Sequence, residues 1–144
     1  MPEIFSELKT IARENFAKYG TILEHKERKS GYEPLIKVNS RGWIWAIMTI
    51  GNKTIKEIEC HPTSKESFEP VFGTTVIVLA PPDEPDKAEA FLLDTSVMLD
   101  EGVWHNILAL SEVSRVKITE NNDVTSQKHG LGREAGVAMV ARST

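Results

Sequence analysis

The stretch Thr74-Thr75-Val76-Ile77-Val78-Leu79-Ala80-Pro81-Pro82 is the clearest strand signal in this sequence. Its first seven residues are mostly β-branched and apolar, a composition that fits the pleated and buried surface of a sheet. The two prolines cannot continue a ladder of hydrogen bonds, so they end the strand. Residues 81–87 carry three prolines and three acidic side chains, which predicts a rigid, exposed loop after it.

Short strand-like segments lie on both sides of this run. Gly51-Asn52 is typical of a two-residue hairpin turn, and the polar, glycine-bearing residues 120–136 are expected to form a surface loop. Many short strands without helices between them favour an all-β fold, a single antiparallel β-barrel or sandwich. The predicted strands are residues 43–50, 54–60, 74–80, 88–94, 97–99, 107–110, 113–119 and 137–141.

The beginning of the chain has a different pattern. Apolar residues recur over positions 3–18 at intervals of three and four, which predicts an amphipathic helix. Pro2 suits the start of a helix and Gly20 its end. We expect this N-terminal helix to pack its apolar stripe on the outside of the β-domain.

Length and composition limit the classes of protein to which the chain can belong. A chain of 144 residues, with 40% hydrophobic and 26% charged residues, predicts one globular domain over residues 1–144. The net charge of −4, without a cluster of Lys and Arg among aromatics, disfavours nucleic-acid binding. The longest apolar run, Trp43 to Met48, is too short to cross a membrane. A single cysteine, with no signal peptide in view, favours a cytoplasmic protein.

The predicted strand at residues 43–50 is apolar on both faces. Trp43, Trp45 and Ile47 share one face, and Ile44, Ala46 and Met48 share the other. A strand of this kind is expected to be buried on both sides. We therefore expect a homodimer whose contact buries the second face, although a covering helix would bury the same surface.

Two histidines from separate strand-and-turn regions are the candidates for chemistry. His61 ends a strand on which it shares a face with Glu59, and Glu66 follows after a four-residue gap. His105 and Trp104 follow a tight turn at Gly102. Two imidazoles with carboxylates can hold a divalent metal, perform acid–base chemistry, or do both.

A structural interpretation stands beside this one. A single strand histidine is more often a hydrogen-bonded structural residue than a catalyst. Cys60 shares a face with Ile58 and is most simply a small core residue. His25 lies in a charged run, and His129 in the polar stretch, so both are expected to be exposed.

The order of five motifs resembles the ureidoglycolate lyase family, whose members are small cupin-like β-barrels. The resemblance covers most of the chain and implies a cupin-type barrel or sandwich. Each motif is short, but five in the right order rarely arise by chance. They are Phe16–Gly20 with Ile22–Glu24, Glu59–Pro70 with its Glu-x-His-Pro and Phe-x-Pro groups, Thr75–Pro82, Ala90-Phe91, and Gly102–His105.

The chain also departs from this family. The family commonly has Gln at the position of Glu66 and a second His at the position of Asn106. Val97-Met98-Leu99 stands where the family has a polar Asn-Tyr pair. These departures leave the identity of the substrate open. The sequence also does not show which cationic side chain would bind a substrate carboxylate. The candidates for that cation are Arg41, Lys56, Lys65 and Arg115.

The resemblance implies an enzyme that cleaves ureidoglycolate, or a related carbinolamide or hydroxy acid, to glyoxylate and urea. His61, His105 and Glu66 would then be catalytic. Glu59 and Trp104 would contact the small-molecule substrate. A divalent metal, if one is bound, would be held by His61, His105, Glu59 and Glu66. Two alternatives are a metal-dependent cupin enzyme, such as an isomerase or dioxygenase, and a non-catalytic cupin that binds a small molecule.

Overall fold

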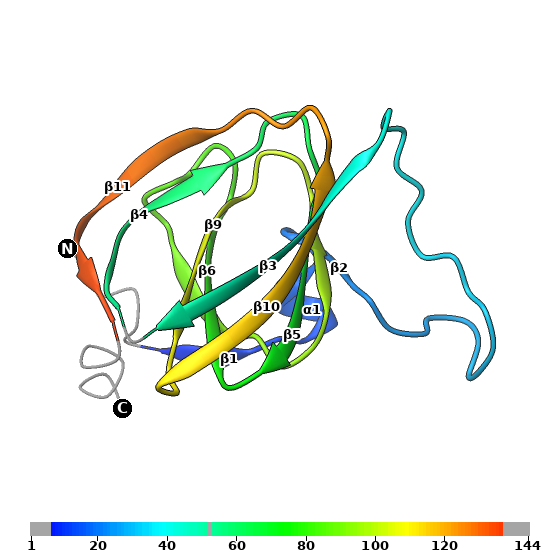
Figure 1. The fold of residues 1–144 in the computed structure, drawn as a ribbon, viewed down its shortest axis with the longest axis horizontal. Coiled ribbons are helices and arrows are strands. Elements are labelled where there is room, and N and C mark those ends of the chain that lie inside the picture. The colour runs from blue at the N-terminus through cyan, green and yellow to red at the C-terminus, as the bar shows by residue number, and fades with distance from the viewer. Residues whose placement is uncertain (1–6, 52, 137–144) are drawn as a thin grey trace.

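The computed structural model describes residues 7–51 and 53–136, which form two β-sheets that face each other (Figure 1). The first sheet has the strand order β1-β7-β6-β9-β4-β11 and the second has the order β2-β8-β5-β10-β3. The strands are β1 (Leu8–Thr10), β2 (Gly20–Ile22), β3 (Trp43–Gly51), β4 (Ile55–Cys60), β5 (Glu66–Phe72), β6 (Thr75–Ala80), β7 (Glu89–Leu92), β8 (Val97–Leu99), β9 (Trp104–Ala109), β10 (Val113–Asn121) and β11 (Gln127–Ala135).

The sheets are almost wholly antiparallel, and the predicted all-β class is confirmed. The one parallel pair among the described strands is β1 with β7. These strands do not close into a barrel, so of the two predicted architectures the sandwich is correct. The segment between β2 and β3, residues 23–42, extends away from the sandwich (Figure 1).

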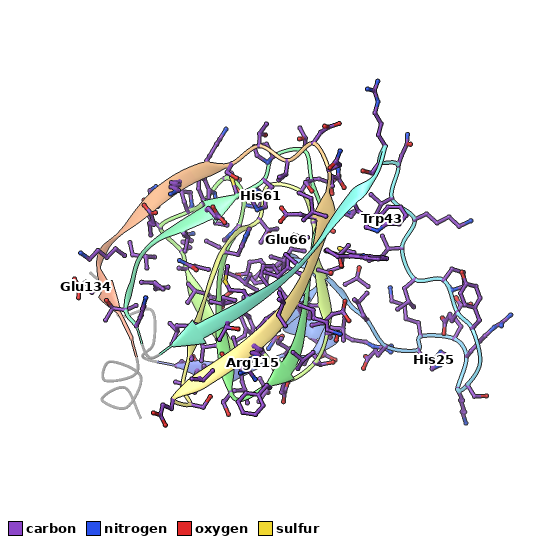
Figure 2. All side chains as sticks on the ribbon, in the orientation of Figure 1. His25, Trp43, His61, Glu66, Arg115 and Glu134 are labelled. Atoms are coloured by element: carbon purple, nitrogen blue, oxygen red, sulfur yellow. The ribbon has the colours of Figure 1, made fainter. Side chains whose placement is uncertain are left out.

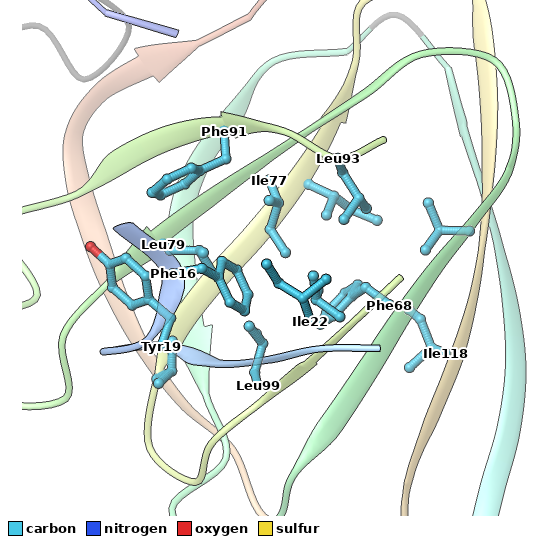
Figure 3. Close-up of a cluster of buried hydrophobic side chains, with 14 residues drawn as sticks. Phe16, Tyr19, Ile22, Phe68, Ile77, Leu79, Phe91, Leu93, Leu99 and Ile118 are labelled. Atoms are coloured by element: carbon cyan, nitrogen blue, oxygen red, sulfur yellow. The ribbon is translucent and has the colours of Figure 1, made fainter. Parts of the chain in front are cut away.

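The main core fills the space between the two sheets. Strand β6 explains its position, because alternate side chains of a strand point to opposite faces. Ile77 and Leu79 point inward to the main core, and Val76, Val78 and Ala80 belong to a second cluster on the other face. The main core is made of Phe16, Tyr19, Ile22, Phe68, Ile77, Leu79, Phe91, Leu93, Val97, Leu99, Val103, Ile107, Val116 and Ile118 (Figure 3).

The predicted N-terminal helix over residues 3–18 is wrong for the residues that the structure describes. Leu8–Thr10 forms strand β1 beside β7, and the only helical turn in this range is the four-residue α1 (Arg13–Phe16). Pairing with a strand distant in sequence outweighs the helical spacing of the apolar residues. Phe16 is nevertheless buried in the core, as its apolar character predicts. Residues 3–6 lie outside the described residues.

Two further predictions concern connections, and the structure corrects both. The strands on either side of Gly51-Asn52 do not form a hairpin, because β3 pairs with β10 in one sheet and β4 pairs with β9 and β11 in the other. The predicted loop at 120–136 is mostly β-strand, since β10 extends to Asn121 and β11 begins at Gln127. The predicted strand at 137–141 lies outside the described residues.

Strand β3 forms as predicted but is not buried on both faces. It is the edge strand of its sheet, and the side chain of Trp45 is 76% exposed. The sequence pattern shows that both faces are apolar, but it does not show what covers them. Among the described residues, no helix has the length and apolar character needed to cross a membrane.

Candidate active site

A turn at Gly102 brings the two predicted histidine motifs together. Gly102 has a φ angle of 79°, a conformation that glycine adopts without steric cost. Its backbone N–H donates a hydrogen bond of 2.9 Å to the carbonyl oxygen of His61. The end of β4 is therefore tied to the turn that precedes β9, and His61 and His105 lie with their ring centroids 5.1 Å apart.

Strands from both sheets contribute to the same site. His105 lies on the inner face of β9 with Ile107, and Glu59 is its direct register partner on β4. Glu66 begins β5 of the second sheet, on the same face as Phe68 in the core. The labelled side chains of His61 and Glu66 lie close together in Figure 2. The site therefore bridges the two sheets at one end of the sandwich.

The carboxylate of Glu66 is the centre of this cluster. Its Oε1 lies 2.8 Å from His105 Nε2 and 3.1 Å from His61 Nε2. Glu66, His61 and His105 are all buried, with exposed fractions of 4–6%. Neither contact has hydrogen-bond geometry, since Glu66 Oε1 and His105 Nε2 have no hydrogen-bond partner among the described residues. The three groups thus point toward a common place rather than forming ordinary hydrogen-bonded pairs.

The far nitrogen of each imidazole is held in place. His105 Nδ1 lies 3.1 Å from the carbonyl oxygen of Val103, which can only accept, so this nitrogen carries a proton. His61 Nδ1 lies 3.0 Å from the carbonyl oxygen of Thr125 and 3.1 Å from the hydroxyl of Ser126. Both rings consequently turn Nε2 toward Glu66. A backbone carbonyl that fixes the far nitrogen of a histidine is common where Nε2 acts on a substrate or a metal.

Within the cluster, the carboxylate and the imidazoles each stabilise the ionised form of the other. The contact with Glu66 raises the pKa of His61 to about 9, against the opposing effect of burial. Burial alone would raise the pKa of Glu66, but His105 and His61 lower it to about 2. At neutral pH the structure therefore favours an ionised Glu66 beside a protonated His61. Such a pair can hold and deliver a proton in a place with little water.

Glu120 is a further member of the site that the sequence analysis missed. Its Oε1 lies 3.8 Å from His61 Nε2, and burial together with the charge of Glu66 raises its pKa. The predicted strand ended at Thr119, two residues before the end of β10 at Asn121. The alternation that places Val116 and Ile118 inside predicts the same inward direction for residue 120, so the signal was present. Thr125 and Ser126 had no such signal, because only the folded chain brings them to His61.

The cluster also fits a divalent cation. Ligand atoms bound at about 2.1 Å from one ion cannot lie more than about 4.2 Å apart. The contacts of Glu66 satisfy this limit, as do the separations of 4.0 Å between His105 and Glu59 and 3.8 Å between His61 and Glu120. With the wider limit of 4.8 Å between ligand atoms, two groups of three residues come together: Glu59, His61 and His105, and His61, Glu66 and Glu120. The mixture of imidazole and carboxylate suits Zn, Mn, Fe or Ni.

Trp104, predicted to contact the substrate, lies outside the cluster. It precedes His105 on β9 and therefore points to the opposite face of the sheet. Its Nε1 donates to the carbonyl oxygen of Pro82 at 3.0 Å, and its ring lies beside His129, 5.8 Å between centroids. Proximity in sequence suggested a shared site, but adjacent strand residues face apart.

Two of the cations considered for a substrate carboxylate, Lys65 and Arg115, have partners outside the cluster. The Lys65 ammonium contacts Asp100 and Glu101, at 3.1 and 2.9 Å. The Arg115 guanidinium stacks on Phe72 at the other end of the sandwich from His61 (Figure 2). Of the residues that replace the polar pair of the family, Leu99 is the register partner of Glu66 on the neighbouring strand β8 and is buried in the core.

The comparison with known families bears directly on this site. The sequence model of the ureidoglycolate lyase family matches residues 36–131, which is more than half of the chain and includes all five acidic and histidine residues of the cluster. This chain belongs to the ureidoglycolate lyase family. The resemblance seen in the sequence motifs is thereby confirmed, and a lyase-type function is supported at the level of the family.

The remaining comparisons add less about this member of the ureidoglycolate lyase family. No curated protein matches the chain. A solved structure of a mutant oxalate decarboxylase from Bacillus subtilis is similar, with 15% identity and a TM-score of 0.47. The similarity covers 62% of this chain and 24% of that oxalate decarboxylase chain, so the chain spans about a quarter of its length.

Proposed function

We propose that this protein is an enzyme that cleaves ureidoglycolate, or a closely related carbinolamide, into glyoxylate and urea. The observation that carries the proposal is the convergence of His61 Nε2 and His105 Nε2 on the buried Oε1 of Glu66. Membership of the ureidoglycolate lyase family supports the substrate class. We place the activity in the cytoplasm, which is consistent with the single, buried and free Cys60.

The reaction requires the transfer of one proton between two atoms of the substrate. In ureidoglycolate one carbon bears both a hydroxyl group and a ureido nitrogen. A base removes the hydroxyl proton, the C–O bond becomes a carbonyl bond, and the C–N bond breaks. The departing nitrogen takes up a proton to give urea. No oxidant or reductant is needed, so acid–base groups at the correct positions supply the chemistry.

The residues of the cluster suit these two roles. His61 holds a proton at neutral pH, because Glu66 raises its pKa to about 9, and can act as the acid toward the leaving nitrogen. His105, whose Nδ1 proton is fixed on the carbonyl oxygen of Val103, presents Nε2 as the base when neutral. Glu66 lies between the two rings and stabilises positive charge on either. The proton can thus pass between the two imidazoles across a cycle.

A divalent cation is compatible with the same residues. His61, His105, Glu59 and Glu66 would hold it, with Glu120 beside them. A bound cation would polarise the hydroxyl oxygen of the substrate and so favour loss of its proton. The buried Oε1 of Glu66 and Nε2 of His105, which have no hydrogen-bond partner among the described residues, favour this metal-dependent form.

The experiment that tests the proposal measures glyoxylate release from racemic ureidoglycolate by purified protein, with and without a chelator. Release of glyoxylate from one enantiomer supports the proposal. Release that survives the chelator supports the metal-free acid–base form, whereas release that stops and returns with added metal supports the metal-assisted form. Absence of glyoxylate in both arms, even with added metal ions, would overturn the proposed substrate.

A further inference from the structure

The sheet that carries His61 and His105 has a weakly paired junction. In this first sheet β4 lies between β11 and β9 (Figure 1). Strand β9 pairs with β6 along its whole length, and β4 pairs with β11 over residues 57–60. Between β4 and β9, however, the described residues form a single register pair, Glu59 with His105. The sheet thus consists of two well-paired parts that meet at the active site.

The side-chain amide of Asn106 lies where the ladder between these two strands would continue. The register beyond Glu59 and His105 places Ile107 opposite Glu57. The backbone N–H of Ile107 instead donates to Oδ1 of Asn106 at 2.8 Å. Nδ2 of Asn106 in turn donates to the carbonyl oxygen of Glu57 at 2.8 Å. The two backbones are therefore linked through a side chain.

Such a link separates the strands more than direct pairing does. One direct N–H···O bond holds neighbouring strands about 4.7–4.9 Å apart. Two such bonds with an amide between them span a longer distance, so β4 diverges from β9 just beyond the pair of Glu59 with His105. On the other side of this pair, the N–H of Gly102 donates to the carbonyl oxygen of His61 at 2.9 Å. One hydrogen bond from outside the ladder thus flanks the pair on each side.

The geometry of the active site depends on this junction. Strand β4 carries Glu59 and leads to His61, whereas β9 carries His105. The separation of 4.0 Å between Glu59 and His105 and that of 5.1 Å between the two imidazole rings both cross the junction. Catalytic groups must be held within about 0.5 Å of their productive geometry. The spacing of β4 and β9 therefore has to be fixed.

We propose that Asn106 is a positioning residue of the active site. Its side-chain amide acts as a spacer that sets the distance between β4 and β9, and with it the distance from Glu59 and His61 to His105. The amide binds backbone groups of the two strands and no side chain of the cluster. The expected effect on turnover rests on the proposed function, whereas the effect on the spacing of the strands does not.

The first test compares crystal structures of the wild type and of Asn106→Leu. Leucine has a similar shape but can neither accept from Ile107 nor donate to Glu57. We expect the separation between Glu59 and His105 to change by at least about 0.5 Å, while β9 keeps its register with β6. Asn106→Asp is a second variant, which keeps the acceptor but loses the donor, and it should change the same separation. An unchanged separation in both variants would overturn the proposal, whatever the substrate.

The second test measures the kinetics of glyoxylate release from ureidoglycolate. We expect Asn106→Leu to lower kcat by about 10- to 100-fold and to change KM by less than about three-fold, since displaced catalytic groups impair the chemical step more than binding. Trp104→Phe is the matched control, because it removes one hydrogen bond at a nearby position of β9 and should keep kcat.

The two tests distinguish the spacer from the proposed function. Equal kcat values for folded Asn106→Leu and Trp104→Phe would overturn the positioning role, even if the strands had moved. A wild type that releases no glyoxylate would refute the proposed substrate. The spacing measured in the crystal structures would then decide the role of Asn106 without reference to turnover.

Discussion

His105 Nε2 lies 2.8 Å from Oε1 of Glu66, although the two residues belong to different sheets. This contact joins β9 to β5 at one end of the sandwich and is buried from solvent. A carboxylate in such a place is costly unless cationic or hydrogen-bonding groups compensate for its lost hydration. His61 and His105 provide that compensation, so the site depends on the correct pairing of both sheets.

Replacement of Glu66 tests its role between the two imidazoles. We expect Glu66→Gln to lower kcat/KM for ureidoglycolate by about 10²–10⁴-fold, the usual contribution of a positioned acid–base group. The amide keeps the shape of the side chain but cannot stabilise positive charge on His61. Glu57→Gln is the matched control, because Glu57 is exposed and pairs with Lys128 instead. Equal values of kcat/KM for the two variants would show that Glu66 has no role in the mechanism.

The pH dependence of stability follows from the pKa values of the pair. The pKa of His61 is raised from 6.5 to about 9, so its stabilising effect is complete below about pH 6.5 and is lost as the pH rises through about 9. The pKa of Glu66 is lowered from 4.5 to about 2, so its effect is complete above about pH 4.5 and is lost as the pH falls through about 2.

Urea unfolding of the metal-free protein measures this dependence. We expect the free energy of unfolding to fall by about 1–3 kcal/mol between pH 6.5 and pH 9.5. His61→Gln should lack most of that decrease, whereas His25→Gln should keep it, because His25 lies on the exposed segment outside the site. A decrease of equal size in all three proteins would show that His61 is not its source.

Binding of a divalent cation can be tested without any substrate. We expect the metal-free protein to bind one equivalent of Zn²⁺ or Mn²⁺ in a calorimetric titration. His61→Gln and Glu59→Gln should each weaken binding by at least about 10-fold, since each removes a ligand. Asp86→Asn is a suitable control, because Asp86 pairs with His129 away from the cluster. Unchanged binding in both site variants would place the cation elsewhere.

Trp104 should be dispensable for activity. It faces away from His105, so Trp104→Phe should leave kcat/KM within about two-fold of the wild type. The variant loses the hydrogen bond from the indole to the carbonyl oxygen of Pro82, which should lower stability by about 1 kcal/mol. Thermal unfolding and the rate of glyoxylate release check these two expectations. A large loss of activity in a stably folded variant would show that Trp104 contributes to the active site.

The sequence predicted the strands whose composition agrees with their place in the fold. The apolar run at 74–80 forms β6, and both faces of this strand are buried. A continuous apolar segment is the pattern typical of such a strand, so the prediction was direct. Residues 8–10 contradict their own helical spacing, because β1 forms only when β7 is beside it. The turn at Gly51-Asn52 was misread for a related reason: local turn chemistry does not say which sheet the next strand joins.

The candidate site was predictable in part. Motif order singled out His61, Glu66 and His105, and the structure brings all three together. Glu120 required only that the alternation of β10 be continued by one residue. The contact of Ser126 with His61 depends on how β11 returns to the first sheet, and no local pattern encodes that return.

The most direct test of the central claim compares two histidine variants in one assay of glyoxylate release from ureidoglycolate. His105→Gln removes an imidazole that contacts Glu66, whereas His129→Gln removes one that contacts Asp86 on the outer side of the sheet. We predict that His105→Gln loses at least about 100-fold in kcat/KM while His129→Gln keeps nearly the full rate. Equal activity of the two folded variants would contradict a catalytic site built on His61, Glu66 and His105.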